Sequence, residues 1–101
     1  NAARNNLAWI LATSASQDLR NAEEALIVAT KLNADTDNKV PQVLDTLAAA
    51  QAANGQFTKA AKSAEIAISQ LKNAPKLKQN IQNRLNLYKK GKAFLQSTKK
   101  E

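Results

Sequence analysis

The sequence predicts an all-α fold, and three observations support this expectation. The chain of 101 residues includes only two glycines and two prolines, so few positions interrupt a helix. Runs of β-branched residues, which favour strands, are few. Apolar residues, mainly Ala, Leu and Ile, recur at the spacings of three and four that mark one face of a helix. The length suits one small domain with a modest core, and the many alanines predict closely packed helices.

The first expected helix covers residues 1–14, and a polar connection over residues 14–20 follows it. The apolar face of this helix is formed by Leu7, Ala8, Trp9, Ile10 and Leu11. A capping box opens the second helix, because Asn21 at the N-cap and Glu24 three residues later can each satisfy a free backbone N–H. The apolar face of the second helix comprises Ala22, Ala25, Leu26, Ala29 and Leu32. Polar residues 33–39 end it.

Proline, threonine and glycine mark the bounds of the third and fourth helices. Pro41 suits the first turn of the third helix, and Gly55 suits the left-handed position that ends it. Thr58 is expected to cap the fourth helix. The inward faces of the two helices are Val43, Leu44, Leu47, Ala48 and Gln51, then Ala60, Ala64, Ala67, Ile68 and Leu71.

A fifth helix is expected over residues 75–90, from Pro75 to a stop at Gly91, with a tail over residues 91–101. One apolar stripe runs along it, made of Leu77, Ile81, Leu85 and Tyr88. Arg84 lies beside this stripe, and we expect it to pair with an acid from an earlier helix. In the tail, Phe94 and Leu95 are the expected anchors.

The formal net charge of +7 is concentrated in the last third of the chain. Residues 1–71 carry six basic and seven acidic side chains, whereas residues 72–101 carry nine basic side chains and one acid. Such asymmetry is typical either of a solvated polar helix or of a surface for an anionic partner. The expected basic surface consists of Lys76, Lys78, Lys89 and Lys90.

Composition argues against an enzyme, a metal site and a cofactor. The chain has no Cys and no His, so it lacks a thiol nucleophile, a thiolate ligand and the usual proton-transfer residue. Asp35 and Asp37 have the spacing of part of a calcium loop, but the bidentate Glu and the central Gly of such a loop are missing. No Gly-rich phosphate loop is present, and no apolar run approaches the ~20 residues that span a bilayer. The absence of Met predicts a processed chain or a piece of a longer one.

Internal similarity with a period near 34 residues indicates a helical repeat. Leu7-Ala8 aligns with Leu47-Ala48, and Ile81 follows Leu47 by 34 residues. The triplet Ala25, Ala29 and Leu32 aligns with Ala60, Ala64 and Ala67. The segment LDTLAAAQAANGQFTKAAKSAEIAI resembles a tetratricopeptide repeat (TPR), and residues 5–94 together resemble the C-terminal end of bacterial multi-TPR proteins.

The resemblance implies one TPR domain over residues 1–101, arranged as an α-solenoid of antiparallel helix pairs. Its units would cover about residues 2–34 and 40–73, and the helix over about 75–90 would cap them. It further implies a soluble, bacterial, non-catalytic scaffold that belongs to a longer chain and binds a peptide or partner protein. In this family the first helix of each pair lines a concave groove. Carried over to this sequence, the groove residues are Asn5, Trp9, Thr13, Gln42, Asp45, Ala49, Ala52, Ala53, Lys76, Gln79 and Asn83.

Three alternatives remain open from the sequence. The basic surface would anchor the chain to nucleic acid or to an anionic membrane surface, although no aromatic ladder accompanies its lysines. The chain would otherwise serve only as the structural end of a longer superhelix, with self-association through the first helix replacing a missing neighbour. Trp9 is either a ligand anchor or a packing residue.

Overall fold

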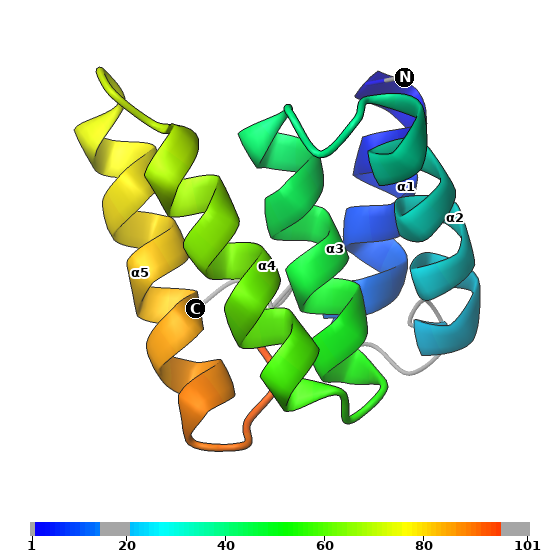
Figure 1. Ribbon diagram of the computed structural model, residues 1–101. Coiled ribbons are helices and arrows are strands. Elements are labelled where there is room, and N and C mark those ends of the chain that lie inside the picture. Colours follow the sequence, from blue (N-terminus) through cyan, green and yellow to red (C-terminus); the bar gives the residue numbers. More distant parts are fainter. Residues whose placement is uncertain (1, 15–20, 96–101) are drawn as a thin grey trace, which may run out of the picture.

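The computed structural model describes residues 2–14 and 21–95. Within these ranges the all-α prediction is confirmed, since the described residues form helices and no strand element (Figure 1). The helices are α1 (Ala2–Thr13), α2 (Ala22–Asp35), α3 (Pro41–Ala53), α4 (Phe57–Gln70) and α5 (Pro75–Lys89). Residues 15–20 of the expected connection and residues 96–101 of the expected tail lie outside the described residues.

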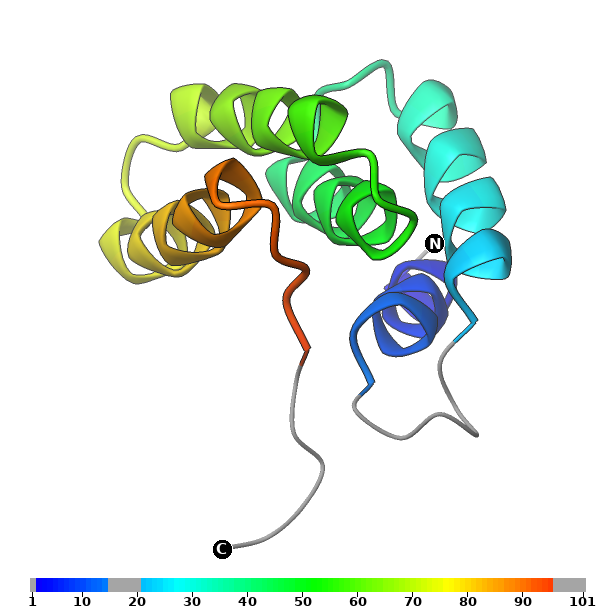
Figure 2. The same cartoon turned by 90° about the horizontal axis from the view of Figure 1, so that it is seen from below.

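Successive helices run in opposite directions and pack on one another, and α1 also packs on α3 (Figure 1). Figure 2 shows that α1, α3 and α5 lie on one side of the molecule, while α2 and α4 lie on the other. The odd-numbered helices curve around an open face, which we call the inner face. In the described part of the chain no helix is both long and apolar enough to cross a membrane.

Local signals at the helix starts are confirmed in part. The Asn21 side chain accepts a hydrogen bond from the backbone N–H of Glu24, 3.1 Å between nitrogen and oxygen, as an N-cap should. The reciprocal half of the capping box was wrong, because the N–H of Asn21 donates to the carbonyl of Leu11 across the α1–α2 connection. Thr58 was also the wrong cap, since α4 begins one residue earlier at Phe57. Both prolines stand in the first turns of their helices, as expected.

Three helices end in the same hydrogen-bonding pattern, the Schellman motif. In α3, Gly55 has a φ of +78°, and the N–H of Gln56 donates to the carbonyl of Gln51. Gly91 plays the same part at the end of α5 with a φ of +72°. At the end of α2 the equivalent residue is Asp37, whose φ of +55° is uncommon for a side chain with a Cβ. The sequence signal of glycine therefore located two of the three ends.

The core divides into two clusters that share α3. Leu44, Ala48 and Ala52 face α4 and α5, while Leu47, Ala49 and Ala50 face α1 and α2. Residues 43–50 are consequently all buried, as expected for a helix with neighbours around it. Most of the buried apolar side chains are alanines, which allows the close packing predicted from composition. The aligned positions of the repeat are buried in both halves: Ala8 and Ala48, Ala25 and Ala60, Ala29 and Ala64, Leu32 and Ala67.

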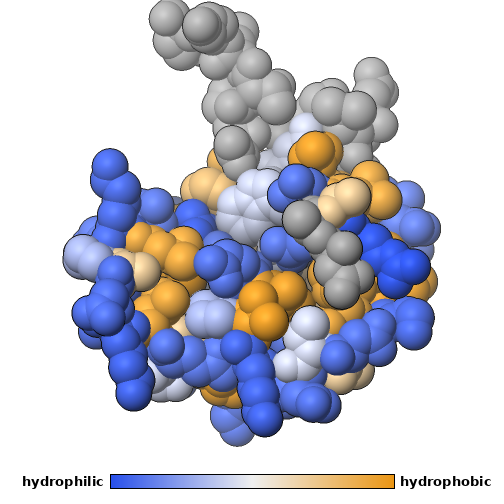
Figure 3. All heavy atoms as spheres, turned by 90° about the horizontal axis from the view of Figure 1, so that it is seen from above, coloured by the Kyte–Doolittle hydropathy of each residue, from blue (hydrophilic) through white to orange (hydrophobic). Residues whose placement is uncertain are grey.

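The predicted apolar face of α1 was wrong at two positions, Leu7 and Ile10. Leu7 is 49% exposed, whereas its aligned residue Leu47 is only 7% exposed because it packs on the α1–α2 pair. Ile10 on α1 and Ile27 on α2 are exposed as well. Figure 3 views the end that carries the α2–α3 and α4–α5 connections, where apolar atoms emerge in separate patches between polar side chains.

Candidate functional site

A buried ion pair on the inner face joins α3 to α5. Arg84 of α5 donates from Nε to Oδ1 of Asp45 at 3.0 Å and from Nη2 to Oδ2 at 2.6 Å. The two side chains are only 12% and 9% exposed. This bidentate geometry, in which planar guanidinium meets planar carboxylate, is the strongest form of a side-chain ion pair. It confirms the expectation that Arg84 pairs with an acid from an earlier helix.

Two aromatic rings surround the same guanidinium. The ring centroids of Trp9 and Phe94 lie 5.0 and 5.2 Å from the Arg84 Cζ, and 5.8 Å from each other at an interplanar angle of 39°. Both distances are within the range of a cation–π interaction. α1, α3, α5 and the segment after α5 therefore each contribute one side chain, and we call Trp9, Asp45, Arg84 and Phe94 the inner-face cluster.

Phe94 reaches this cluster because the chain reverses after α5. Gly91 adopts the left-handed conformation, and residues 92–95 then turn towards the inner face instead of continuing the helix. Figure 2 shows this segment, in orange and red, running between α5 and α1. Phe94 is half-buried, but Leu95 is 47% exposed, so only the first of the two expected anchors holds.

Burial shapes the electrostatics of the cluster. It raises the pKa of Asp45 above its usual range, and the hydrogen bonds and charge of Arg84 oppose that shift. Tyr88 lies behind the pair, and burial likewise raises the pKa of its phenol, with the charge of Asp45 acting in the same direction. The Tyr88 hydroxyl is buried and has no hydrogen-bond partner among the described residues. Because the ion pair cancels its own charge, the cluster presents an almost neutral surface to its surroundings.

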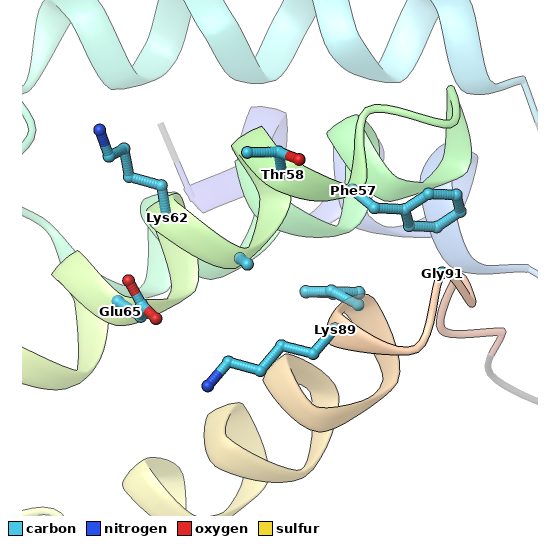
Figure 4. A pocket seen from close by; sticks show the side chains of 8 residues that line it. Phe57, Thr58, Lys62, Glu65, Lys89 and Gly91 are labelled. Atoms are coloured by element: carbon cyan, nitrogen blue, oxygen red, sulfur yellow. The ribbon is translucent and has the colours of Figure 1, made fainter.

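Two pockets lined by described residues adjoin α5, on different sides of the helix. The inner-face pocket, of about 430 Å³, is lined by Trp9, Asn80, Asn83, Arg84, Leu87 and Phe94. The flank pocket, of about 480 Å³, lies between α4 and α5 and is drawn in Figure 4. Its lining includes Lys62, Glu65 and Lys89, and Figure 4 shows the Lys62 and Lys89 side chains pointing away from each other, with Phe57 beside Gly91 at one end. One carboxylate between two lysines offers no nucleophile and base in mutual contact, so we do not assign chemistry to it.

The structure does not bring all of the predicted groove residues together. Trp9 and Asn83 line the inner-face pocket, and Asp45 joins it through Arg84. Gln79, which hydrogen-bonds Asn83 at 3.0 Å, is exposed, as are Gln42 and Lys76. Asn5 and Ala53 are half-buried. By contrast, the interior holds Thr13, Ala49 and Ala52, each at most 2% exposed.

The predicted basic surface is split between the two ends of α5. Lys76 and Lys78 are exposed in its first turn, and Lys89 and Lys90 are exposed at its end. At 1.5 Å per residue the two pairs are about 20 Å apart, roughly two Debye lengths at physiological salt. They therefore reinforce one another only weakly. Arg84, a further cation of this third of the chain, is neutralised by Asp45.

Sequence reasoning missed the contribution of Phe94 to this site. Helix periodicity locates the stripe on α5 and places Arg84 beside it, but no periodic signal continues past Gly91. The available signal was a single aromatic residue following a helix stop, which indicates an anchor without showing what it contacts.

Among residues 2–14 and 21–95, no group of three or more acidic side chains is placed to hold a metal ion. Comparison with family models, with curated proteins and with solved structures found no match to this chain.

Proposed function

We propose that this chain is a non-catalytic protein–protein interaction module of the TPR type, which binds a peptide or partner protein on its inner face. In this proposal α1–α2 and α3–α4 are two successive units of a solenoid, and α5 is the helix that caps them. The resemblance of residues 44–68 to a TPR motif is the source of the proposal.

The packing of equivalent residues supports the repeat. Ala25 and Ala60 are both fully buried at aligned positions, as are Ala8 and Ala48. Leu47 packs on the preceding pair of helices in the way that stacked repeats require. The alternation of the helices between two sides also fits stacked pairs (Figure 2).

The inner-face pocket is the observation on which the binding proposal chiefly rests. It combines an apolar, aromatic wall at Trp9 and Leu87 with amide side chains at Asn80 and Asn83. Binding sites for peptides commonly have this composition, because apolar side chains supply affinity and amides hydrogen-bond the peptide backbone. The odd-numbered helices hold these side chains on rigid elements, which reduces the entropy lost on binding.

A peptide-library selection on the immobilised full chain tests the proposal. We expect the selected peptides to lose at least tenfold in affinity when Asn83→Lys changes the inner face. Asn83 is exposed, so this substitution leaves the core intact. The matched control is Glu65→Lys on the flank pocket, which also adds positive charge at an exposed helical position but should leave affinity unchanged.

Peptides that respond to Glu65→Lys and ignore Asn83→Lys would place binding on the flank and contradict the proposal. The anionic-surface alternative makes a different prediction for the same chain. It requires binding to nucleic acid or anionic vesicles that weakens steeply with salt and is lost when Lys76, Lys78, Lys89 and Lys90 are changed to Glu. The separation of the lysines along α5 does not favour it.

A further inference from the structure

We propose that Trp9 and Arg84, at the edge of the inner-face pocket, form a binding site for an aromatic side chain, which Phe94 occupies in the free chain and which a partner peptide takes over by displacing residues 93–95. This inference rests on the proposed function and adds to it the class of ligand and a means of regulation. Phe94 would then compete with the partner peptide for the same site.

The contacts of Phe94 identify the chemistry of the ligand. Its ring lies against the Trp9 ring at 5.8 Å and against the Arg84 guanidinium at 5.2 Å, at the edge of a pocket of about 430 Å³. Aromatic rings favour such offset contacts with another ring and with a cation. Asp45 already satisfies the charge of Arg84, so the site has little attraction left for a carboxylate. A neutral aromatic side chain, Phe or Tyr, fits it best.

The attachment of the segment suits it to displacement. Lys92 donates to the carbonyl of Leu87 and so belongs to the end of α5. Beyond it, no hydrogen bond joins residues 93–95 to the helices in the described part of the chain. Leu95 is about half exposed. The segment is therefore held by the packing of Phe94 and the smaller Ala93 alone, whereas a longer peptide could add backbone hydrogen bonds to Asn80 and Asn83.

The chain carries its own reporter, because Trp9 is its single tryptophan. The probe is a synthetic peptide with the sequence of residues 90–96, Lys-Gly-Lys-Ala-Phe-Leu-Gln. It is titrated into the full wild-type chain and into the Phe94→Ala variant, with Trp9 fluorescence as the signal. Since occupation by Phe94 reduces the fraction of competent sites, we expect the peptide to bind the variant at least about tenfold more tightly than the wild type.

Two controls make this expectation specific. Leu95→Ala removes an exposed apolar side chain from the same segment and should leave the wild-type affinity unchanged. The same peptide with Ala in place of Phe should fail to bind Phe94→Ala. If Phe94→Ala proves unstable by circular dichroism, a chain that ends at residue 92 removes the segment and gives a second test of the same expectation.

Equal affinity of the peptide for wild type and Phe94→Ala would overturn the inference, as would binding that does not require its Phe. If the Phe94→Ala variant instead forms a dimer with added wild-type chain, whose Phe94 enters the vacant site of the variant, the natural occupant is a second copy of the chain. The proposal of a partner peptide would then be wrong. Library peptides that depend on Asn83 but do not compete with the probe would leave the proposed function standing while removing this inference.

Discussion

At the scale of single residues, Asp45 and Arg84 are two oppositely charged side chains that are buried together and connect α3 to α5. A buried ion pair contributes little net stability, since the desolvation of both charges offsets their attraction. The loss of one partner is different, because it leaves a charge without compensation. The pair therefore acts mainly to fix where α5 sits on α3, and with it the aromatic site on the inner face.

Replacing one member of this ion pair should lower the free energy of unfolding more than replacing both members. We expect Asp45→Leu or Arg84→Met alone to lower the free energy of unfolding by about 3–5 kcal/mol. The double variant should recover at least about 2 kcal/mol of that loss, because two apolar side chains replace two charges. Urea unfolding of the four proteins in this cycle measures the coupling. Losses that simply add would show that the two side chains do not depend on each other.

The buried phenol of Tyr88 should make stability fall at high pH. Burial raises the pKa of Tyr88, so the folded chain keeps a proton that the unfolded chain releases above about pH 10. The unfolded state binds fewer protons there, and the free energy of unfolding should therefore decrease as pH rises, by up to about 1.4 kcal/mol per unit. Thermal unfolding from neutral pH to about pH 11 measures it, and phenolate absorbance reports the single tyrosine directly.

Tyr88→Phe is the matched control for this pH dependence. The variant should lose the extra slope above about pH 10, and at neutral pH it should be at least as stable as wild type. The reason is that the hydroxyl is buried without a hydrogen-bond partner among the described residues, a cost of about 1–3 kcal/mol that Phe avoids. A marked loss of stability at neutral pH would mean that the hydroxyl makes a useful contact.

At the scale of elements, the same turn is built from different residues at two helix ends. Gly55 and Asp37 both occupy the left-handed position of a Schellman motif. We expect Gly55→Ala to lower the free energy of unfolding by about 1–2 kcal/mol, because alanine is strained in the left-handed conformation. The loss should not be larger, since the added Cβ would meet no neighbour within 4 Å. Asp37→Gly should raise stability by less than about 1 kcal/mol, as relief of strain exceeds the added chain entropy. Thermal unfolding of both variants checks the opposite signs.

The elements were predictable because their signals are local, whereas the site was not. Prolines in first turns, Asn21 as a cap and glycine at two helix ends all act within a few residues, so the sequence displays them. The site depends instead on where the segment after Gly91 packs. Tertiary contacts decide that position, and no local pattern in the sequence shows them. Arg84 was an intermediate case: its helical angle placed it correctly, but only packing selected Asp45 as its partner.

At the scale of the whole molecule, α3 explains why the inner face is rigid. One side of α3 packs on α1 and α2, and the other side packs on α4 and α5. Both core clusters therefore include residues of α3. The ion pair and the aromatic contacts then connect α5 back to α3 and α1. At the other end of the helix series, α1 has an open edge, where Leu7 and Ile10 are exposed.

That open edge predicts weak self-association through α1. Leu7 is 49% and Ile10 is 48% exposed at positions whose aligned residues, Leu47 and Ala50, pack on a neighbouring pair of helices. A stable interface needs about 800 Å² on each partner, and two apolar side chains supply only part of it. We therefore expect concentration-dependent dimers in sedimentation equilibrium, with association weakened at least tenfold by Leu7→Glu combined with Ile10→Lys. Ile27→Lys, on the other helix of the pair, is the matched control and should change association little. A wild-type chain that stays monomeric at all concentrations would show that this edge does not pair with itself.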